Sequence, residues 1–307
     1  MKQNLLARFF KELKERQKQS IDAQPIDINH IAKSGILGAV IGDIVGSTHE
    51  FLQTKSTDFD FYTDNNHCTD DTIMTIAVAE WLISTPQPIG NDTLPTIMRK
   101  WGKKYPWAGY GRMFHRWLMS DYEADQRPYN SFGNGAGMRV SACGFFVKSL
   151  DEALELAKLS AEVSHNHPEG IKGAQAIASA IFLARQHQPK ESIREYIARQ
   201  FDYDMDRSCD SIRPDYEFDE TCQGSCPEAI IAFLESTDFE DAIRLAISLG
   251  GDSDTIGAMT GGIAAAYYGI PDDIAHKALE YIPGDMIEVL NLFSDAVNRR
   301  EQISHEC

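Results

Sequence analysis

Two short segments of this sequence place a pair of aspartates and a threonine hydroxyl directly before a helix-like stretch. Residues 68–72 read Cys-Thr-Asp-Asp-Thr and precede an apolar run at 73–83. Residues 250–255 read Gly-Gly-Asp-Ser-Asp-Thr and precede a stretch rich in Gly and Ala that ends near Tyr268. The first-turn N–H groups and the helix dipole favour negative charge, by roughly 0.3–1 kcal/mol for each group. Helix capping is therefore the simpler interpretation of either segment alone.

Together the two segments supply more oxygen atoms than capping requires, because a cap uses only one side-chain oxygen. If the segments converge, carboxylates about 4 Å apart repel each other by on the order of 4 kcal/mol per pair at an effective dielectric constant of 20. A divalent cation would relieve that repulsion, and all-oxygen ligands suit Mg²⁺, Mn²⁺ or Ca²⁺ better than Zn²⁺. The sequence therefore predicts a cation site that takes aspartates from both segments, namely Asp70, Asp71, Asp252 and Asp254.

Three further segments carry candidate chemistry of weaker specificity. Residues 42–50 end an apolar helix and leave Glu50 in a loop, where a solvated glutamate is the alternative interpretation. Residues 131–139 form a glycine-rich turn whose N–H groups could hold a phosphate, or which is only a turn. This turn lacks the lysine of a P-loop and the preceding strand of a dinucleotide-binding fingerprint. Residues 164–170 place two histidines in a loop, a pattern that more often has a structural role.

The elements that must position these residues are almost all helical. Apolar residues recur at helical spacing through most of the chain, and alternating strand patterns are scarce. We expect one helix over about 31–45 and a surface connection over the acidic, irregular segment 202–220. Other helices are expected to start near Thr69, Asp92, Gly135, Asp151, Gly170, Glu191, Ser225, Asp238, Asp254, Asp272 and Asp285. The predicted fold class is all-α.

Composition limits the function classes. The chain has 307 residues, 43% of them hydrophobic, which suffices for one large domain. Its net charge of −17 argues against nonspecific nucleic-acid binding. No apolar run is long enough to span a membrane, and the N-terminus lacks the pattern of a secretory signal, so we expect a cytoplasmic protein with no membrane partner. Cys222 and Cys226 have the spacing of half a zinc site without a second half, which favours ordinary reduced thiols.

We expect the first 33 residues to form a basic amphipathic arm and a linker ahead of the predicted domain at 34–307. Its apolar stripe consists of Leu5, Leu6, Phe9, Phe10 and Leu13. That stripe must be covered, because large apolar side chains exposed together promote association. Packing against the domain, docking onto a protein partner, and membrane-surface binding or mitochondrial targeting are the three alternatives.

The ordered set of segments resembles the ADP-ribosylglycohydrolase family. The similar segments are GDIVGSTHEF, TDDT, SFGNGAGMRV, SHNHPEGIKGAQA and SLGGDSDTIGAMTGGIAAAYYGIP, together with Gly109-Tyr110-Gly111 and DYEFDETCQGSCPEAIIAFLES. Five segments in the same order over more than about 200 residues are a specific signal. The resemblance runs from about Gly35 to the C-terminal helices, so the arm lies outside it.

The resemblance implies a single-domain all-α fold around two Mg²⁺ or Mn²⁺ ions. The metal positions that match are Thr69, Asp70 and Asp71 from one side and Asp252, Asp254 and Thr255 from the other. Glu50 matches the glutamate implicated in activating or positioning the attacking water. The loop that holds the diphosphate and ribose matches Ser131, Phe132, Gly133, Asn134 and Gly135, and the substrate-side histidine matches His165.

The implied function is removal of ADP-ribose from modified proteins, with ADP-ribosyl-arginine as the first expectation. Serine-linked ADP-ribose, poly(ADP-ribose) and O-acetyl-ADP-ribose are alternative substrates. A different class of function is that of an immunity-type protein whose N-terminal arm binds and neutralises an ADP-ribosylating toxin. Intact metal positions favour the enzyme, whereas an added arm permits the binding role, and the two are compatible.

Overall fold

The computed structural model describes residues 27–33 and 35–305, and all regular elements within them are helices. In chain order they are α2 (Ile28–Lys33), α3 (Ile36–Gly46), α4 (Asp70–Ser84), α5 (Leu94–Lys104), α6 (Arg112–Met119), the 3₁₀ helix η1 (Glu123–Gln126), α7 (Gly135–Met138), α8 (Ser141–Phe146), α9 (Leu150–Glu162), α10 (Pro168–Arg185), α11 (Lys190–Phe201), α12 (Cys209–Ile212), α13 (Cys222–Glu235), α14 (Phe239–Ser248), α15 (Ser253–Tyr268), α16 (Asp272–Ala278) and α17 (Gly284–His305). The predicted all-α class is confirmed.

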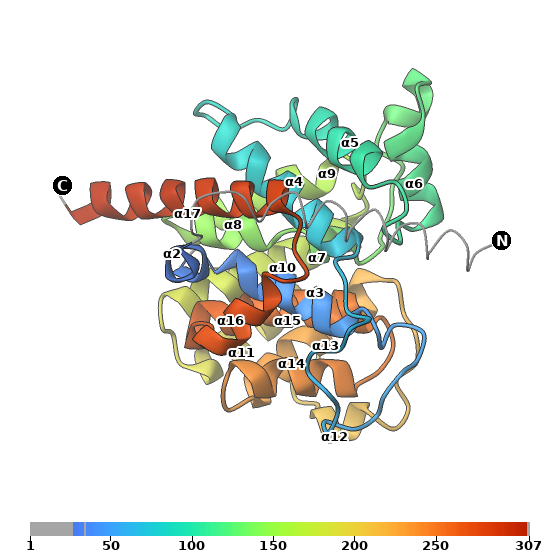
Figure 1. The fold of residues 1–307 in the computed structure, drawn as a ribbon, viewed down its shortest axis with the longest axis vertical. Helices are drawn as coiled ribbons and strands as arrows, with labels where there is room; N and C mark the ends of the chain where they lie inside the picture. Colours follow the sequence, from blue (N-terminus) through green and yellow to red (C-terminus); the bar gives the residue numbers. More distant parts are fainter. Residues whose placement is uncertain (1–26, 34, 306–307) are drawn as a thin grey trace.

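The centre of the fold is a close crossing of α3 and α15 (Figure 1). Gly38, Gly42 and Gly46 recur every four residues and so share one face of α3. A Cβ atom added to Gly42 would lie 1.9 Å from the carbonyl oxygen of Gly257, so the two backbones touch directly. A Cβ atom on Gly46 would lie 2.5 Å from the Cα atom of Asp254. The crossing therefore brings the C-terminal end of α3 to the N-terminal end of α15.

The other helices enclose this central pair. α10 packs against α8, α9, α13 and α15, while the long α17 packs against α2 and α4 (Figure 1). Among the largest fully buried side chains are Trp81, Trp117, Phe233, Phe239 and Phe293, which come from five different helices. One continuous hydrophobic core joins these helices, so the ends of α3, α4 and α15 are held by a rigid framework.

The N-terminal part of the fold differs from the prediction. The single helix expected over 31–45 is two helices, α2 and α3. Gly35 has a left-handed φ of 75°, which a right-handed helix cannot continue through, and a Cβ atom there would overlap the ring of Phe145. α2 packs against α3, α16 and α17. The apolar stripe of the predicted arm lies outside the described residues, and the boundary at residue 33 stays a prediction.

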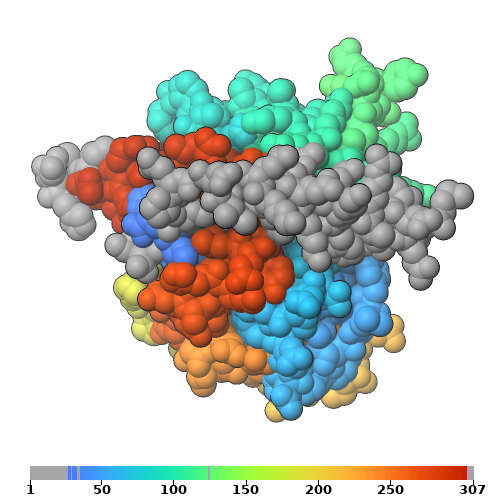
Figure 2. Space-filling view, viewed as in Figure 1, coloured from blue at the N-terminus to red at the C-terminus, as the bar shows by residue number. Residues whose placement is uncertain are grey.

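Two further segments contain helices that the sequence pattern did not predict. Residues 112–119, which follow α5 and a short loop, form α6, and the acidic segment 202–220 contains the short helix α12. Residues 51–65 lie mostly at the surface as an irregular segment (light blue in Figure 2). In the part of the chain that the structure describes, no helix is long and apolar enough to cross a membrane.

Candidate active site

A cavity of about 390 Å³ opens where the N-terminal ends of α4 and α15 meet. Its lining includes all but one of the site residues predicted from the sequence, namely Glu50, Thr69, Asp70, Asp71, Ser131, Gly133, Asn134, Gly135, His165, Asp252, Asp254 and Thr255. The exception is Phe132. Its side chain is 45% exposed and meets the ring of His167 edge-on, with 5.3 Å between the ring centres. The carboxylate side consists of Glu50, Thr69, Asp70, Asp71, Asp252, Asp254 and Thr255. The loop side consists of Ser131, Gly133, Asn134, Gly135 and His165.

Asp43 anchors the N-terminal end of α4, where the first-turn N–H groups lack partners within the helix. One of its oxygens accepts hydrogen bonds from the backbone N–H groups of Thr69 (2.9 Å) and Thr72 (3.1 Å) and from the Thr72 hydroxyl. Its other oxygen accepts from the Thr69 hydroxyl at 2.6 Å. Because Asp43 is fully buried and both of its oxygens accept hydrogen bonds, we interpret it as the residue that orients Thr69 and Thr72.

The N-terminal end of α15 supplies the opposing carboxylates. Gly250 and Gly251 have φ values of 76° and 72°, a left-handed conformation that favours glycine, and they turn the chain into the helix. Asp254 and Thr255 follow in its first turn, and the Thr255 hydroxyl donates to Asp71 at 3.3 Å. The two predicted aspartate segments therefore do meet, from α4 and from α15.

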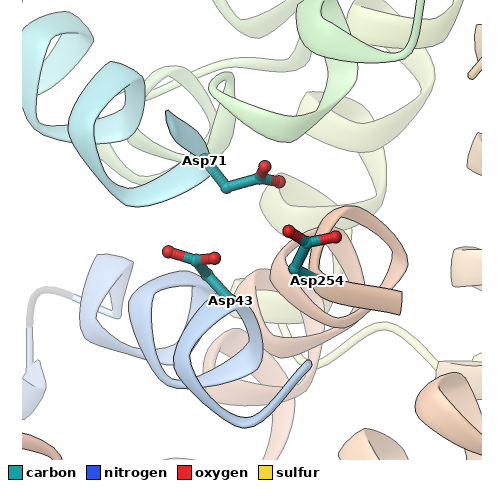
Figure 3. Close-up of side chains that lie close together, drawn as sticks. All are labelled: Asp43, Asp71 and Asp254. Carbon is teal, nitrogen blue, oxygen red and sulfur yellow. The ribbon is translucent and has the colours of Figure 1, made fainter. Parts of the chain in front are cut away.

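The carboxylate oxygens are close enough for one cation to contact several of them. Asp43, Asp71 and Asp254 each place an oxygen within 4.8 Å of the others, and Figure 3 shows the three side chains converging. Glu50 and Asp252 form a second such group with Asp254. These oxygens suit a hard divalent cation, and the buried Oδ1 atom of Asp71 has no hydrogen-bond partner within the described residues. The residues present therefore fit the predicted metal ions.

The pKa values of the acidic residues on the carboxylate side are raised because these residues are buried close to one another. Burial, followed by the charge of Asp254, raises the pKa values of Asp70 and Asp71 well above their ordinary range. Burial and then the charges of Asp254, Asp43 and Glu220 raise the pKa of Glu50 to about 8. A bound cation would oppose these shifts, because it stabilises the ionised carboxylates.

The glycine-rich turn on the loop side is fixed against the segment before α13. Gly133 forms an isolated bridge with Thr221, and the backbone N–H of Asn134 donates to the carbonyl of Glu220 at 2.7 Å. The side-chain amide of Asn134 donates to Asp252 at 2.6 Å and to Ser225 at 3.2 Å. Asn134 thus connects the loop side to the carboxylate side.

The two histidines of residues 164–170 have different places. His165 is 4% exposed and lines the cavity, with the rings of Phe114 and Tyr129 each 5.9 Å from its own ring. His167 instead accepts a hydrogen bond from the backbone N–H of Glu169 and caps α10. The structural interpretation of the pair therefore holds for His167 alone.

Some lining residues were not singled out from the sequence as site residues. Gly109 has φ 106°, and a Cβ atom there would lie 3.2 Å from an oxygen of Asp70. Met113 on α6 and Phe218 in the acidic segment line the cavity while 58% and 41% exposed. The acidic segment is therefore part of the cavity wall as well as a surface connection. The sequence signals for this wall were the segments Gly109-Tyr110-Gly111 and DYEFDETCQGSCPEAIIAFLES, the second of which contains Phe218.

The zinc alternative finds no support in the thiols. Cys222 and Cys226 lie inside α13 as buried free cysteines. The Cys222 thiol donates to the carbonyl of Gly133 at 3.1 Å, and that of Cys226 lies 3.6 Å from the sulfur of Met259. These contacts are those of ordinary reduced thiols that support the glycine-rich turn.

Comparisons with known proteins identify a family for this chain. The family model described as ADP-ribosylglycohydrolase matches residues 25–304. The mouse protein named ADP-ribosylhydrolase ARH3 is 25% identical over 76% of this chain and 83% of its own length. The Pseudomonas putida protein named ADP-ribosylarginine hydrolase Tri1 is 27% identical over 78% of this chain and 71% of its own length. A solved structure described as an ADP-ribosylglycohydrolase-related protein complex has the same fold, with a TM-score of 0.66, 23% identity, and coverage of 88% of this chain and 99% of that one.

Proposed function

Because this chain belongs to the ADP-ribosylglycohydrolase family, we propose that its cavity removes ADP-ribose from modified proteins and that ADP-ribosyl-arginine is its substrate. The observation that carries this proposal is the meeting of the two aspartate segments opposite the glycine-rich turn. The carboxylate side suits the reacting ribose with its cations, and the loop side suits the rest of ADP-ribose.

Two Mg²⁺ or Mn²⁺ ions are the proposed cofactors. Thr69, Asp70 and Asp71 would hold them from α4, and Asp252, Asp254 and Thr255 would hold them from α15. When bound, such ions can chelate ribose hydroxyls and lower the pKa of a water molecule. Asp43 contributes by holding Thr69 in place through the 2.6 Å hydrogen bond between their side chains.

Glu50 is the proposed general base. Hydrolysis breaks the bond between C1″ of the distal ribose and the acceptor nitrogen and forms a bond from C1″ to a water oxygen. The Glu50 carboxylate would take the proton of that water, and the departing guanidine would gain one. Glu50 suits this role because it lines the cavity and lies within 4.8 Å of Asp252 and Asp254. The residues of the glycine-rich turn would hold the diphosphate and ribose and so contribute orientation.

The charge of the cavity supports a cationic acceptor. Among the described residues, its lining carries six carboxylates and one arginine, Arg112. Two divalent cations would offset four of these six negative charges, and the excess that remains would attract a guanidinium group, whereas the neutral oxygen of serine would not be attracted. The exposed side chains of Met113 and Phe218 at the wall provide apolar contact for a protein that carries the modification. The relative Tri1 has the corresponding activity in its name.

A panel of substrates tests the proposal. Arginine-linked and serine-linked ADP-ribosyl peptides, poly(ADP-ribose) and O-acetyl-ADP-ribose are each incubated with Mg²⁺, with Mn²⁺ and with a chelator. We expect the arginine-linked peptide to be hydrolysed at least about tenfold faster than the others, equivalent to roughly 1.4 kcal/mol. A faster serine-linked reaction would make the acceptor wrong, and full activity in chelator would make the metal chemistry wrong.

The toxin-binding alternative depends on the N-terminal arm, most of which lies outside the described residues. It stays a prediction, and so does the cytoplasmic location. Binding to an ADP-ribosylating toxin would be compatible with hydrolysis, since both sides of the cavity are supplied by described residues.

A further inference from the structure

His165 faces the cavity with one ring nitrogen and the protein interior with the other. Its Nδ1 atom lies 2.8 Å from the hydroxyl oxygen of Ser164. Its Nε2 atom is on the opposite side of the ring, 3.1 Å from where a Cβ atom of Gly135 would lie and 3.5 Å from where one of Gly133 would lie. The Nε2 atom is therefore the one that points to the glycine-rich turn and to whatever that turn holds.

Behind Ser164 stands a fully buried arginine. One terminal nitrogen of Arg139 donates to the hydroxyl oxygen of Ser164 at 3.0 Å and to the backbone carbonyl of Ser160 at 2.7 Å. Its other two side-chain nitrogens have no hydrogen-bond partner within the described residues, and its guanidinium carbon lies 5.7 Å from the centre of the Phe114 ring. Burying an arginine with so few hydrogen-bond partners costs free energy, which indicates that its hydrogen bond to Ser164 has a functional role.

The donor properties of these groups determine the position of the histidine proton. A guanidinium group only donates, so the Ser164 oxygen must accept from Arg139. The single hydroxyl proton of Ser164 then needs an acceptor, and Nδ1 of His165 lies within reach. If Nδ1 carried a proton instead, two donors would face the Ser164 oxygen and its own buried proton would lack a partner.

We propose that Arg139 and Ser164 are positioning residues that hold His165 as the neutral imidazole with its proton on Nε2, so that it donates a hydrogen bond to an oxygen of bound ADP-ribose. This inference rests on the proposed function for the identity of the ligand, but not for the protonation of the ring. It gives His165 the role of a fixed donor rather than that of a general acid or base.

The surroundings of His165 oppose its protonation. Burial, followed by the positive charge of Arg139, lowers the pKa of His165 well below its ordinary value. The Phe114 ring on α6 is uncharged, and burial raises the pKa of Tyr129 to about 12, so the tyrosine is neutral as well. The ring therefore stays neutral through the physiological pH range.

Nuclear magnetic resonance of ¹⁵N-histidine-labelled protein tests the proposal directly. In the wild type we expect Nε2 of His165 to be protonated and Nδ1 unprotonated, with no change between about pH 6 and pH 8. A ring that is protonated on Nδ1, or that becomes cationic within this range, would overturn the proposal. The measurement needs neither substrate nor metal ion, so it decides the proposal even if the protein proves not to hydrolyse ADP-ribosyl-arginine.

Variants connect the ring to ligand binding. Ser164→Ala should remove the bias between the two tautomers and weaken ADP-ribose binding by about tenfold, whereas Ser164→Thr should restore both because it keeps the hydroxyl. Ser160→Ala is the matched control, since the Ser160 hydroxyl has no hydrogen-bond partner within the described residues and only its backbone carbonyl meets Arg139. It should change neither measurement.

A second pair of variants remains informative if Ser164→Ala does not fold. The amide nitrogen of glutamine reaches about as far as Nε2, and that of asparagine only about as far as Nδ1. His165→Gln should therefore bind ADP-ribose within about threefold of the wild type, and His165→Asn should bind at least about tenfold more weakly. Equal losses in the two variants would contradict a donor at Nε2. Absence of ADP-ribose binding by the wild type would instead reject the proposed function.

Discussion

The two sides of the cavity differ in how their polar groups are satisfied. On the loop side, Asn134 donates to two side-chain oxygens and His165 is bonded to Ser164. On the carboxylate side, Asp71 keeps a buried oxygen without a partner within the described residues, and burial with mutual repulsion raises the pKa values. The loop side is organised before a ligand arrives, whereas the carboxylate side needs a cation to be stable in its ionised form. The functional residues of one cavity thus differ in how much they reduce the stability of the folded state.

The largest expected effect comes from removing the carboxylate shared by both acidic groups. Asp254→Ala should lower the rate of hydrolysis by at least about 10³-fold, because several kcal/mol of metal-derived stabilisation are lost. The same change should raise the unfolding free energy of chelator-treated protein by on the order of 1–2 kcal/mol, because repulsion is relieved. Activity assays and urea unfolding measure the two effects, and the exposed Asp273→Ala is the control. If the chelator-treated Asp254→Ala variant were less stable than the chelator-treated wild type, the proposed repulsion on the carboxylate side would be wrong.

Glu50→Gln should have the next largest effect, and it separates catalysis from binding. We expect turnover to fall by roughly 10²–10⁴-fold, the usual contribution of a positioned acid or base. Metal and ADP-ribose binding, measured by calorimetry, should be retained because the amide keeps the shape of the side chain. An equal loss of binding and turnover would show that Glu50 has a structural role.

The stability of the metal-free protein should depend on pH. The pKa of Glu50 is raised to about 8 from an ordinary 4.5, so between these values the folded state binds more protons than the unfolded state. Stability should therefore fall as pH rises from about 5 to about 8, by on the order of 3 kcal/mol after allowance for solvent screening. Thermal unfolding in chelator measures this fall, which saturating Mg²⁺ should reduce or reverse. If the stability of the chelator-treated protein did not depend on pH, the carboxylates would not be destabilised by burial and mutual repulsion in the folded state.

Deleting residues 1–26 should have the smallest effect on catalysis. The described residues supply both sides of the cavity, so hydrolysis of a small ADP-ribosyl substrate should stay within about twofold of the full chain. Toxin binding, if the arm provides it, should weaken by at least about tenfold, or roughly 1.4 kcal/mol. Loss of catalysis or unfolding would show that the arm belongs to the fold.

The sequence was sufficient to predict the all-α class and the meeting of two aspartate segments, because helix-start residues and like charges leave local signals. It did not reveal the role of Asp43, whose partners Thr69 and Thr72 are distant in sequence. A charged residue inside an otherwise apolar helix was the only available sign. Nor did it single out Phe218 as a lining residue, because the resemblance of its segment to the family does not tell which side chain of that segment faces the cavity.

The hydrogen bond from Thr255 to Asp71 joins residues 184 positions apart. At about 5–20 residues per second, a ribosome needs about 10–40 s to add the intervening chain after Asp71. Until then the first aspartate segment has no partner across the cavity, and the proposed metal ions would have only the ligands from α4. Under the proposed metal binding, capture of the ions would therefore come late in the synthesis of the chain, after most of the helical core has been made. If the proposed ions bind, scarcity of metal would impair a late step in the maturation of this protein rather than the early collapse of the chain.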